Sequence, residues 1–392
     1  MKTTRSIATA LAALAVISFA ATAQKCSGQE EQPIHDDSDI TLLDEASFVE
    51  GAPDDGYSLQ TLHGGDLVLQ STSFGGRVVS LWVPDRDGRR EDVVVGHAKV
   101  TEYIDFVGER FLGSSPGPVA NRIGGAAFDL GGNHYVLSAN DGANTLHGGD
   151  KGIDMLNWDV AAVTDSSVTY KVLHPDGLDG FPGNTQITMT YTLTVNNEFQ
   201  VDFEAVSDKD TPINLAHHSF FNLCGVGRGT ILGHILTINA SFATPVDEQL
   251  IPTGETTPLE GTPRDFRTPH AIGERIDDYS DPQMAYGHGY DHNFILDRAT
   301  PDGMETAAVV EEPVSGRVME VITDQPGLQF YSGYFFDGTT KDKYGNDNVR
   351  NCSIALETQK FPDAVHHPSF PDVVLKAGEI YRHRCVYRFG TN

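Results

Sequence analysis

Short runs of alternating apolar and polar residues, separated by glycine, asparagine and aspartate, fill most of the chain from about Tyr57 onward. The clearest run covers residues 185–195 (TQITMTYTLTV), and residues 199–206 (FQVDFEAV) continue the alternation after the turn at residues 196–198. A period of two places apolar side chains on one face of a strand. The two runs therefore predict a β-hairpin with one buried face.

Similar alternating runs occur at residues 66–70, 77–83, 316–323 and 380–389. Outside the first residues, no window of about twelve residues shows the 3.6-residue period of an amphipathic helix. Turn signals such as Asp87-Gly88, Gly131-Gly132 and Asp302-Gly303 recur, and no linker interrupts the middle of the chain. The pattern predicts an all-β fold, in the form of one large antiparallel β-sandwich.

The first residues have the pattern of an export signal. Lys2 and Arg5 form a basic start, an apolar run extends from Ile7 to Ala21, and Ala21-Thr22-Ala23 supplies small residues for a signal peptidase. We expect residues 1–23 to be a signal peptide, residues 24–56 an acidic, solvated leader, and residues 57–392 the β-sandwich domain. Export would be to the periplasm or the extracellular space. An uncleaved membrane anchor is the alternative.

Composition narrows the possible partners and redox setting. The chain has 55 acidic and 27 basic side chains, a net charge of −28, which excludes a nucleic acid partner because phosphate backbones require clustered Lys and Arg. After signal cleavage we expect no membrane association. In an oxidising compartment Cys352 and Cys385 could form a disulfide. The absence of a CxxC motif argues against structural zinc, and Asn239 and Asn351 begin possible glycosylation sequons if the host is eukaryotic.

Five segments place ionisable or amide side chains beside residues that normally lie in a protein interior. They are residues 121–124 (NRIG), 144–149 (NTLHGG), 214–223 (NLAHHSFFNL), 289–294 (GYDHNF) and 355–359 (ALETQ). Buried polar groups need hydrogen-bond partners. We therefore expect these five polar clusters to converge on one another or on a ligand.

In this order the polar clusters resemble the aldose 1-epimerase (galactose mutarotase) family, and the resemblance runs from about Ser58 to Phe389. Residues 83–88 (VPDRDG), 179–184 (DGFPGN) and 378–382 (GEIYR) extend it. It implies a β-sandwich of the galactose mutarotase type. It also implies an isomerase that interconverts the α and β anomers of free aldohexoses such as glucose and galactose, without a cofactor.

The chemistry of anomer interconversion suits the residue types in these clusters. Ring opening removes a proton from the C1 hydroxyl and delivers one to the ring oxygen, so one base and one acid suffice, with exchanged roles on closure. A histidine and a carboxylate can fill these roles near neutral pH. We expect a broad pH optimum, limited by a carboxylate on the acid side and an imidazole on the alkaline side. No metal is expected.

The resemblance assigns roles to individual residues. It makes His218 the general acid at the ring oxygen and Glu357 the general base at the C1 hydroxyl. It implies a set of sugar-binding residues, namely Asn121, Arg122, His147, Asp291 and Gln329. Phe330 or a nearby aromatic residue could stack on the apolar face of the pyranose ring.

Structural roles remain open for some of these residues. His217 is the nearest competitor of His218, but neighbouring strand residues point in opposite directions, and His217 is then a supporting or surface residue. Arg122 could be a buried ion-pair partner of Asp291 or Glu357, and Glu357 could be an ordinary exposed strand residue. We interpret His292 as structural, and His366 and His367 as loop residues.

Other functions remain open as well. A sugar-binding module without catalysis would need no matched acid and base. A glycosidase or lyase could use Asp291 and Glu357 as its two carboxylates. A metal-dependent β-barrel enzyme is a further alternative. The sequence predicts neither the preferred sugar nor the oligomeric state.

Overall fold

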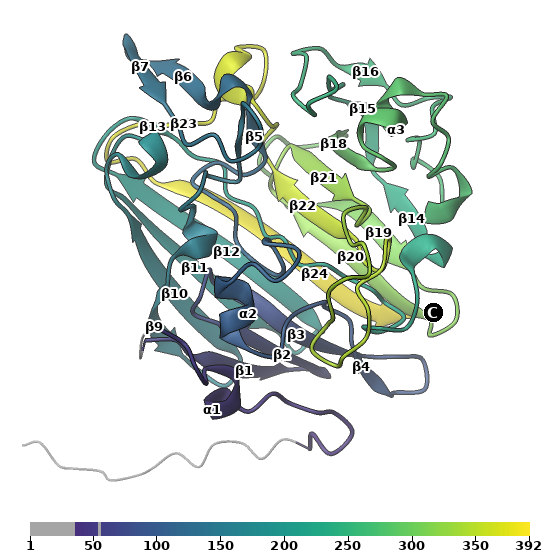
Figure 1. The fold of residues 1–392 in the computed structure, drawn as a ribbon. Coiled ribbons are helices and arrows are strands. Elements are labelled where there is room, and N and C mark those ends of the chain that lie inside the picture. Colours follow the sequence, from purple (N-terminus) through teal and green to yellow (C-terminus); the bar gives the residue numbers. More distant parts are fainter. Residues whose placement is uncertain (1–35, 54–55) are drawn as a thin grey trace, which may run out of the picture. The chain divides into compact units, whose positions relative to one another are not determined.

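The structure is a computed structural model that describes residues 36–53 and 56–392. In this part of the chain the helices are short: α1 is Glu45–Phe48, α2 is Val100–Ile104 and α3 is Pro282–Tyr286 (Figure 1). The rest is mainly antiparallel sheet, as the alternating pattern predicted. No helix among the described residues has the length and apolar character needed to cross a bilayer.

The largest sheet has nine strands, and they run diagonally through Figure 1. In spatial order they are β17 (His270–Ala271), β14 (Ile235–Ile238), β19 (Glu305–Glu311), β20 (Arg317–Thr323), β24 (Tyr381–Thr391), β12 (Glu198–Ser207), β11 (Thr185–Leu193), β10 (Ser167–His174) and β9 (Asp159–Val163). The predicted hairpin is β11 and β12, with Thr185 opposite Ser207 and Leu193 opposite Phe199. Its buried positions alternate, so this prediction is confirmed.

Two smaller sheets pack against the large one. The four-stranded sheet has the order β1 (Leu59–Gly64), β2 (Leu67–Thr72), β3 (Arg77–Pro84) and β4 (Arg90–Asp92). The five-stranded sheet has the order β16 (Thr257–Pro258), β15 (Ala240–Ala243), β18 (Asp291–Leu296), β21 (Gly327–Tyr331) and β22 (Ala355–Gln359). Buried residues of all three sheets, such as Leu81, Tyr191 and Phe330, form one continuous apolar cluster. The core therefore lies between sheets, as in a sandwich.

Short ribbons and turns complete the part of the chain that the structure describes. The ribbons are β5 (Arg122–Ile123) with β8 (Thr145–Leu146), β6 (Ala127–Leu130) with β7 (Asn133–Val136), and β13 (Thr211–Pro212) with β23 (Val374–Leu375). The 3-10 turns are η1 (Gly124–Ala126), η2 (Ile153–Met155), η3 (Leu178–Gly180), η4 (Ile231–Gly233), η5 (Ile272–Glu274) and η6 (Ala364–His366). The β5–β8 ribbon matters most for function, because it joins two of the polar clusters.

The interpretation of the leader as solvated is wrong for residues 36–53. Phe48 at the end of α1 is fully buried and packs in a second apolar cluster with Val79 and Tyr103. The amide of Gln70 donates to the carbonyl of Leu43 and its Oε1 accepts from the Leu43 N–H. Acidic residues of the segment take part in the docking as well, because Asp37 and Asp39 form ion pairs with Arg90 at the end of the four-stranded sheet. The predicted signal peptide, residues 1–23, lies outside the described residues.

The suggested disulfide is also not formed, because Cys352 and Cys385 are both free thiols. Cys385 lies on β24 in the main apolar cluster, whereas Cys352 belongs to the second cluster. The structure therefore holds the two thiols in different apolar clusters and does not join them. Nearness of their segments in sequence was therefore misleading.

Candidate active site

Residues from all of the polar clusters meet in one pocket of about 90 Å3. Its lining comprises Glu109, Phe111, Asn121, Arg122, Leu146, His147, His218, Asp291, Tyr331, Phe335 and Glu357. Larger hollows of about 550 and 720 Å3 lie elsewhere on the surface, but no residue of the polar clusters lines them. The polar clusters therefore converge as predicted.

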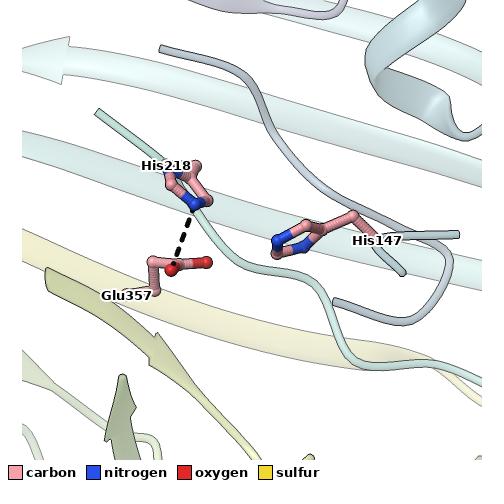
Figure 2. A group of neighbouring side chains, drawn as sticks. All are labelled: His147, His218 and Glu357. Carbon is pink, nitrogen blue, oxygen red and sulfur yellow. Dashed lines mark ion pairs between the residues drawn. The ribbon is translucent and has the colours of Figure 1, made fainter. Parts of the chain in front are cut away.

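His218 and Glu357 are in direct contact in the lining of this pocket. The Nε2 atom of His218 lies 3.2 Å from Oε1 of Glu357 (Figure 2). Glu357 is the central residue of β22, and both side chains are almost completely buried. Among the described residues, His218 Nδ1 and Glu357 Oε2 have no hydrogen-bond partner. Unsatisfied buried polar atoms are uncommon, and here two of them occur in one side-chain pair.

The backbone of residues 217–219 decides which of two adjacent histidines enters the pocket. The N–H of His218 donates to the Ser114 carbonyl, which fixes this segment as a strand-like bridge. His217 consequently points the other way, into the core, where its Nε2 lies 2.7 Å from Ser219 Oγ and its ring packs on Tyr191. His217 is only 1% exposed, so it is a core residue and not a surface residue.

His147 forms the wall of the pocket opposite the pair. It has a positive φ of 51° in the turn after β8, and its ring centroid lies 5.3 Å from that of His218. The backbone N–H of Asn121 donates to His147 Nδ1 at 3.1 Å. A neutral imidazole that accepts at Nδ1 carries its hydrogen on Nε2. His147 can thus donate a hydrogen bond from Nε2.

The same three side chains are the described group that could hold a metal ion, since their ligand atoms lie within 4.8 Å of one another (Figure 2). Coordination through Nε2 of His147 would require the other tautomer, and that tautomer would lose the hydrogen bond from Asn121. The observed hydrogen bonding fits proton transfer and hydrogen-bond donation better than metal binding.

Asn121 and Arg122 lie where β5 begins. Asn121 has a positive φ of 59°, and its Oδ1 accepts from the N–H of Arg122, so the turn is fixed from within. The Nε atom of Arg122 lies 2.7 Å from Oδ2 of Asp141. The partner of Arg122 is therefore neither Asp291 nor Glu357, the two that the sequence left open.

Asp291 and Gln329 lie on neighbouring strands of the five-stranded sheet. Asp291 is the first residue of β18, and its Oδ1 accepts from Nε2 of Gln329 at 2.6 Å. Gln329 stands opposite Glu357 in the register of β21 and β22. It is not among the residues that line the pocket. The hydrogen bond from Gln329 therefore helps to fix the orientation of the Asp291 carboxylate, and Oε1 of Gln329 has no partner among the described residues.

Four lining residues carry no motif in the sequence: Glu109, Phe111, Tyr331 and Phe335. Phe335 is 60% exposed, and its N–H donates to the Tyr331 hydroxyl, which holds the aromatic side chain over the pocket. Phe330, the suggested stacking residue, is fully buried and packs on Tyr290 instead. Of the two possibilities that the sequence left open, Phe330 or a nearby aromatic residue, the lining contains the nearby Tyr331 and Phe335.

The remaining histidines have structural roles. His292 is fully buried, and its ring bridges the backbone at the carbonyl of Gln283 and the N–H of Asp291. His366 and His367 both contact the Asp363 carboxylate next to the turn η6. These interpretations are confirmed.

Burial governs the electrostatics of the pocket. It raises the pKa of Glu357 well above its usual range, and the carboxylates of Asp291 and Glu109 add to this shift. Burial lowers the pKa of His218 to about 3. It also lowers the pKa of His147 well below its usual range, to which His218 contributes. Each shift disfavours the charged form, so the pair of His218 and Glu357 holds a single shared proton over a wide pH range.

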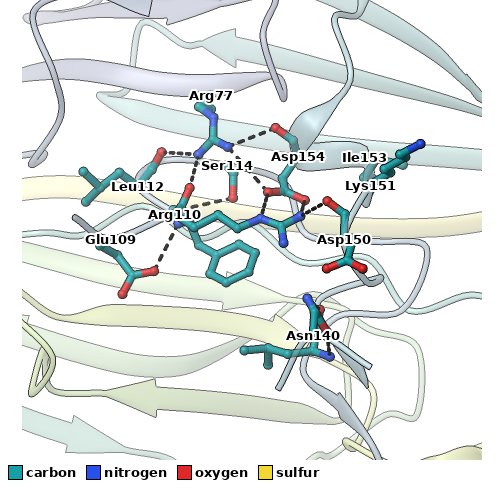
Figure 3. Close-up of polar contacts among 12 residues, drawn as sticks. Arg77, Glu109, Arg110, Leu112, Ser114, Asn140, Asp150, Lys151, Ile153 and Asp154 are labelled. Carbon is teal, nitrogen blue, oxygen red and sulfur yellow. Dashed lines mark hydrogen bonds and ion pairs between the residues drawn. The ribbon is translucent and has the colours of Figure 1, made fainter. Parts of the chain in front are cut away.

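A buried ion-pair network supports the wall of the pocket that contains Glu109 and Phe111 (Figure 3). Arg110 donates from Nε and Nη2 to the Asp154 carboxylate at 2.8 and 2.9 Å. Arg77 lies 3.6 Å from the same carboxylate, and it also donates to the carbonyls of Arg110 and Leu112. The side chains of Arg77 and Asp154 have no exposed surface.

Asp154→Ala is expected to lower the free energy of unfolding by about 3–5 kcal/mol, because it leaves the buried guanidinium of Arg77 without its counter-charge. Urea denaturation followed by fluorescence measures this loss. The matched control is Asp87→Ala, which removes an exposed carboxylate whose partner Arg89 is 76% exposed, and should cost less than about 1 kcal/mol. Equal losses in the two variants would contradict a structural role for the network.

Comparisons with known proteins agree with this geometry. The family model described as aldose 1-epimerase matches residues 58–388. The galactose mutarotase of Sus scrofa is 41% identical over 328 residues, which cover 84% of this chain and 92% of that protein. The aldose 1-epimerase of Escherichia coli is 35% identical over 337 residues, which cover 85% of this chain and 95% of that protein.

Solved structures give the same result for the fold. The crystal structure of an aldose epimerase homologue from C. elegans superposes with a TM-score of 0.79 at 27% identity, covering 86% of this chain and 99% of that one. These sheets thus form a sandwich of the galactose mutarotase type. With a family match over most of its length and relatives of this similarity, the chain belongs to the aldose 1-epimerase family.

Proposed function

We propose that this protein is an aldose 1-epimerase, an isomerase that interconverts the α and β anomers of free aldohexoses such as glucose and galactose. One observation carries the proposal: an imidazole and a carboxylate, His218 and Glu357, lie 3.2 Å apart, both nearly buried, in a pocket that residues of all five polar clusters line. The relatives named galactose mutarotase and aldose 1-epimerase support the same activity.

In the proposed mechanism the sugar binds beside the contact of these two side chains, with its C1 hydroxyl against Glu357 and its ring oxygen against His218. The single proton of the pair first moves from Glu357 to His218. Glu357 then takes the proton of the C1 hydroxyl while His218 donates a proton to the ring oxygen, and the bond between C1 and the ring oxygen breaks. The open-chain aldehyde rotates about the C1–C2 bond. The ring then closes on the other face of C1, with His218 removing the proton and Glu357 returning one. Both side chains end in their starting states.

The other polar residues of the pocket serve binding in this proposal. His147 donates a hydrogen bond to the sugar from Nε2. The Nε2 atom carries the hydrogen because the backbone N–H of Asn121 donates to Nδ1. Asp291, oriented by Gln329, accepts from a sugar hydroxyl. The exposed ring of Phe335 offers an apolar face to the pyranose ring, since aromatic side chains present both an apolar body and a rigid shape.

Polarimetry tests this function. Freshly dissolved α-glucose or α-galactose should reach anomeric equilibrium faster with the protein than in buffer alone. Wild-type protein that follows the buffer rate on a panel of aldoses would reject the enzyme and favour a sugar-binding module. Release of reducing ends from oligosaccharides, without faster mutarotation, would indicate a glycosidase.

We expect kcat/KM to show a broad plateau against pH. The imidazole sets its acid limb and the carboxyl its alkaline limb, which is the reverse of the sequence-based expectation. Catalysis needs one proton on the pair, and burial lowers the pKa of His218 while it raises that of Glu357. A second proton therefore binds only well below the ordinary histidine pKa of about 6.5, which sets the acid limb. The last proton leaves only above the usual carboxyl range, which sets the alkaline limb.

Buffer-corrected polarimetry across pH, with circular dichroism to verify folding at each point, measures this profile. An acid limb near the ordinary pKa of imidazole would contradict the proposed single-proton state. The alkaline limb should also disappear from any residual activity of Glu357→Gln, because that variant has no carboxyl at this position.

We also propose that residues 1–23 direct export and are removed, which leaves the acidic leader and the sandwich domain as the mature protein. The basic start, apolar run and small residues before position 24 support this. The intact mass of the secreted or periplasmic protein should correspond to a chain that begins near Gln24. A mass that includes the apolar run would support the uncleaved anchor instead.

A further inference from the structure

A third carboxylate, Glu109, lines the pocket beside Asp291 and Glu357. It precedes the wall residue Phe111 by two positions and belongs to none of the polar clusters. Its side chain is half-buried, so it is neither an ordinary surface group nor a core residue. A carboxylate at the edge of a binding pocket can contribute to ligand binding if its position is fixed.

The position of Glu109 is fixed on several sides. The N–H of Phe111 donates to Oε1 of Glu109 at 3.1 Å (Figure 3). The next residue, Arg110, is clamped through two hydrogen bonds to the buried Asp154 carboxylate. Arg77 holds the carbonyl oxygen of Arg110 as well. The carboxylate is therefore pre-organised and can bind a ligand without a large loss of conformational entropy.

The local electrostatics place Glu109 close to the reacting groups. Burial raises the pKa of Glu109, and the nearby Asp291 adds to this, while the hydrogen bond from Phe111 and the charges of Arg77 and Arg110 oppose it. The charge of Glu109 in turn contributes to the raised pKa of Glu357. Glu109 thus faces the same space as the other two carboxylates.

No unpaired arginine or lysine balances these three carboxylates among the described residues that line the pocket. Arg122 is the single arginine in the lining, and it is ion-paired to Asp141 at 2.7 Å. Arg110, adjacent to Glu109 in the chain, is committed to Asp154. The pKa values of the two lining histidines are lowered, so the imidazoles do not supply lasting positive charge. The carboxylates of the lining would consequently repel an anionic ligand, and no unpaired cationic side chain in the lining would attract it.

We propose that Glu109 is a substrate-binding and specificity-determining residue: its carboxylate accepts a hydrogen bond from a sugar hydroxyl away from C1 and helps to exclude anionic sugars, such as uronates and aldose phosphates. This inference rests on the proposed function. Oε1 is partly used by Phe111, and the remaining acceptor positions of the carboxylate are available to the sugar. Neutral aldoses donate hydroxyl hydrogens to it, whereas a second anion would meet like charge.

The test compares Glu109→Gln and Glu109→Ala with wild type by polarimetry on galactose and glucose, with galacturonate as a competing anion. Hydrogen bonds to charged groups are worth about 1.5–3 kcal/mol, so KM should rise about tenfold or more while kcat changes less than about threefold. Inhibition by galacturonate should become several-fold stronger in Glu109→Gln, which keeps the shape but removes the charge.

Asp105→Asn is the matched control, because Asp105 is an exposed carboxylate close in sequence and outside the pocket lining. It should change neither KM nor inhibition by galacturonate. Calorimetric binding of galactose to wild type and Glu109→Gln gives a second readout that does not depend on turnover. An active wild type with unchanged KM, affinity and anion inhibition in both Glu109 variants would overturn this inference and leave the proposed function standing. A wild type without mutarotation would reject the function itself.

Discussion

Glu357→Gln is expected to lower kcat by about 10²–10⁴-fold, the range that a positioned general base contributes. The amide has nearly the same shape and can still hydrogen-bond a sugar hydroxyl, but it cannot accept the C1 proton. KM should therefore change little. Fresh-anomer polarimetry at several sugar concentrations separates the two parameters.

This variant should also fold at least as well as wild type. Burial and the charges of Asp291 and Glu109 all disfavour an ionised carboxylate at position 357, so a neutral amide relieves that cost. Glu260→Gln, which changes an exposed carboxylate outside the pocket, is the matched control and should retain full activity. A Glu357→Gln protein with near wild-type kcat would remove the base from the mechanism.

His218→Asn is expected to lower kcat by a similar factor of about 10²–10⁴, because the shorter amide cannot protonate the ring oxygen. The imidazole packs against Phe111 and Phe220, with ring centroids 6.1 and 4.8 Å away, so some packing is lost as well. Activity must accordingly be expressed per folded molecule, with the folded fraction taken from circular dichroism.

The neighbouring residue provides the control for that loss of packing. His217→Asn makes the same chemical change in the aromatic core, where the ring contacts Tyr191, Phe199 and Tyr387. It should lower thermal stability yet keep kcat within a few-fold of wild type. If His217→Asn abolished turnover and His218→Asn did not, the assignment of the two histidines would be reversed.

Local sequence pattern was sufficient for the strands. The alternation in residues 185–206 predicted both strands of the β11–β12 hairpin, because side-chain direction in a strand depends only on the period of two. It was insufficient in β21, where every residue from Gly327 to Tyr331 is buried. A strand covered on both faces has no alternation, and so the sequence could not tell that Phe330 lies in the core.

Motif order supplied a large part of the pocket. Six of the residues predicted from the family resemblance line it, namely Asn121, Arg122, His147, His218, Asp291 and Glu357. Their types are recognisable because polar side chains beside apolar ones are unusual. Gln329 is absent from the lining but donates to the lining residue Asp291, so its predicted contact with the sugar stays a prediction.

The sequence by itself determined the all-β character, the main hairpin and the residue types available for proton transfer. The tertiary structure alone decided that Glu109 and Phe335 border the pocket, that Cys352 and Cys385 remain apart, and that residues 36–53 dock on the sheets. The physical reason is one of range. The alternation that predicts a strand involves neighbouring residues. The walls of the pocket come from segments far apart in the sequence, and the packing of three separate sheets decides whether they meet.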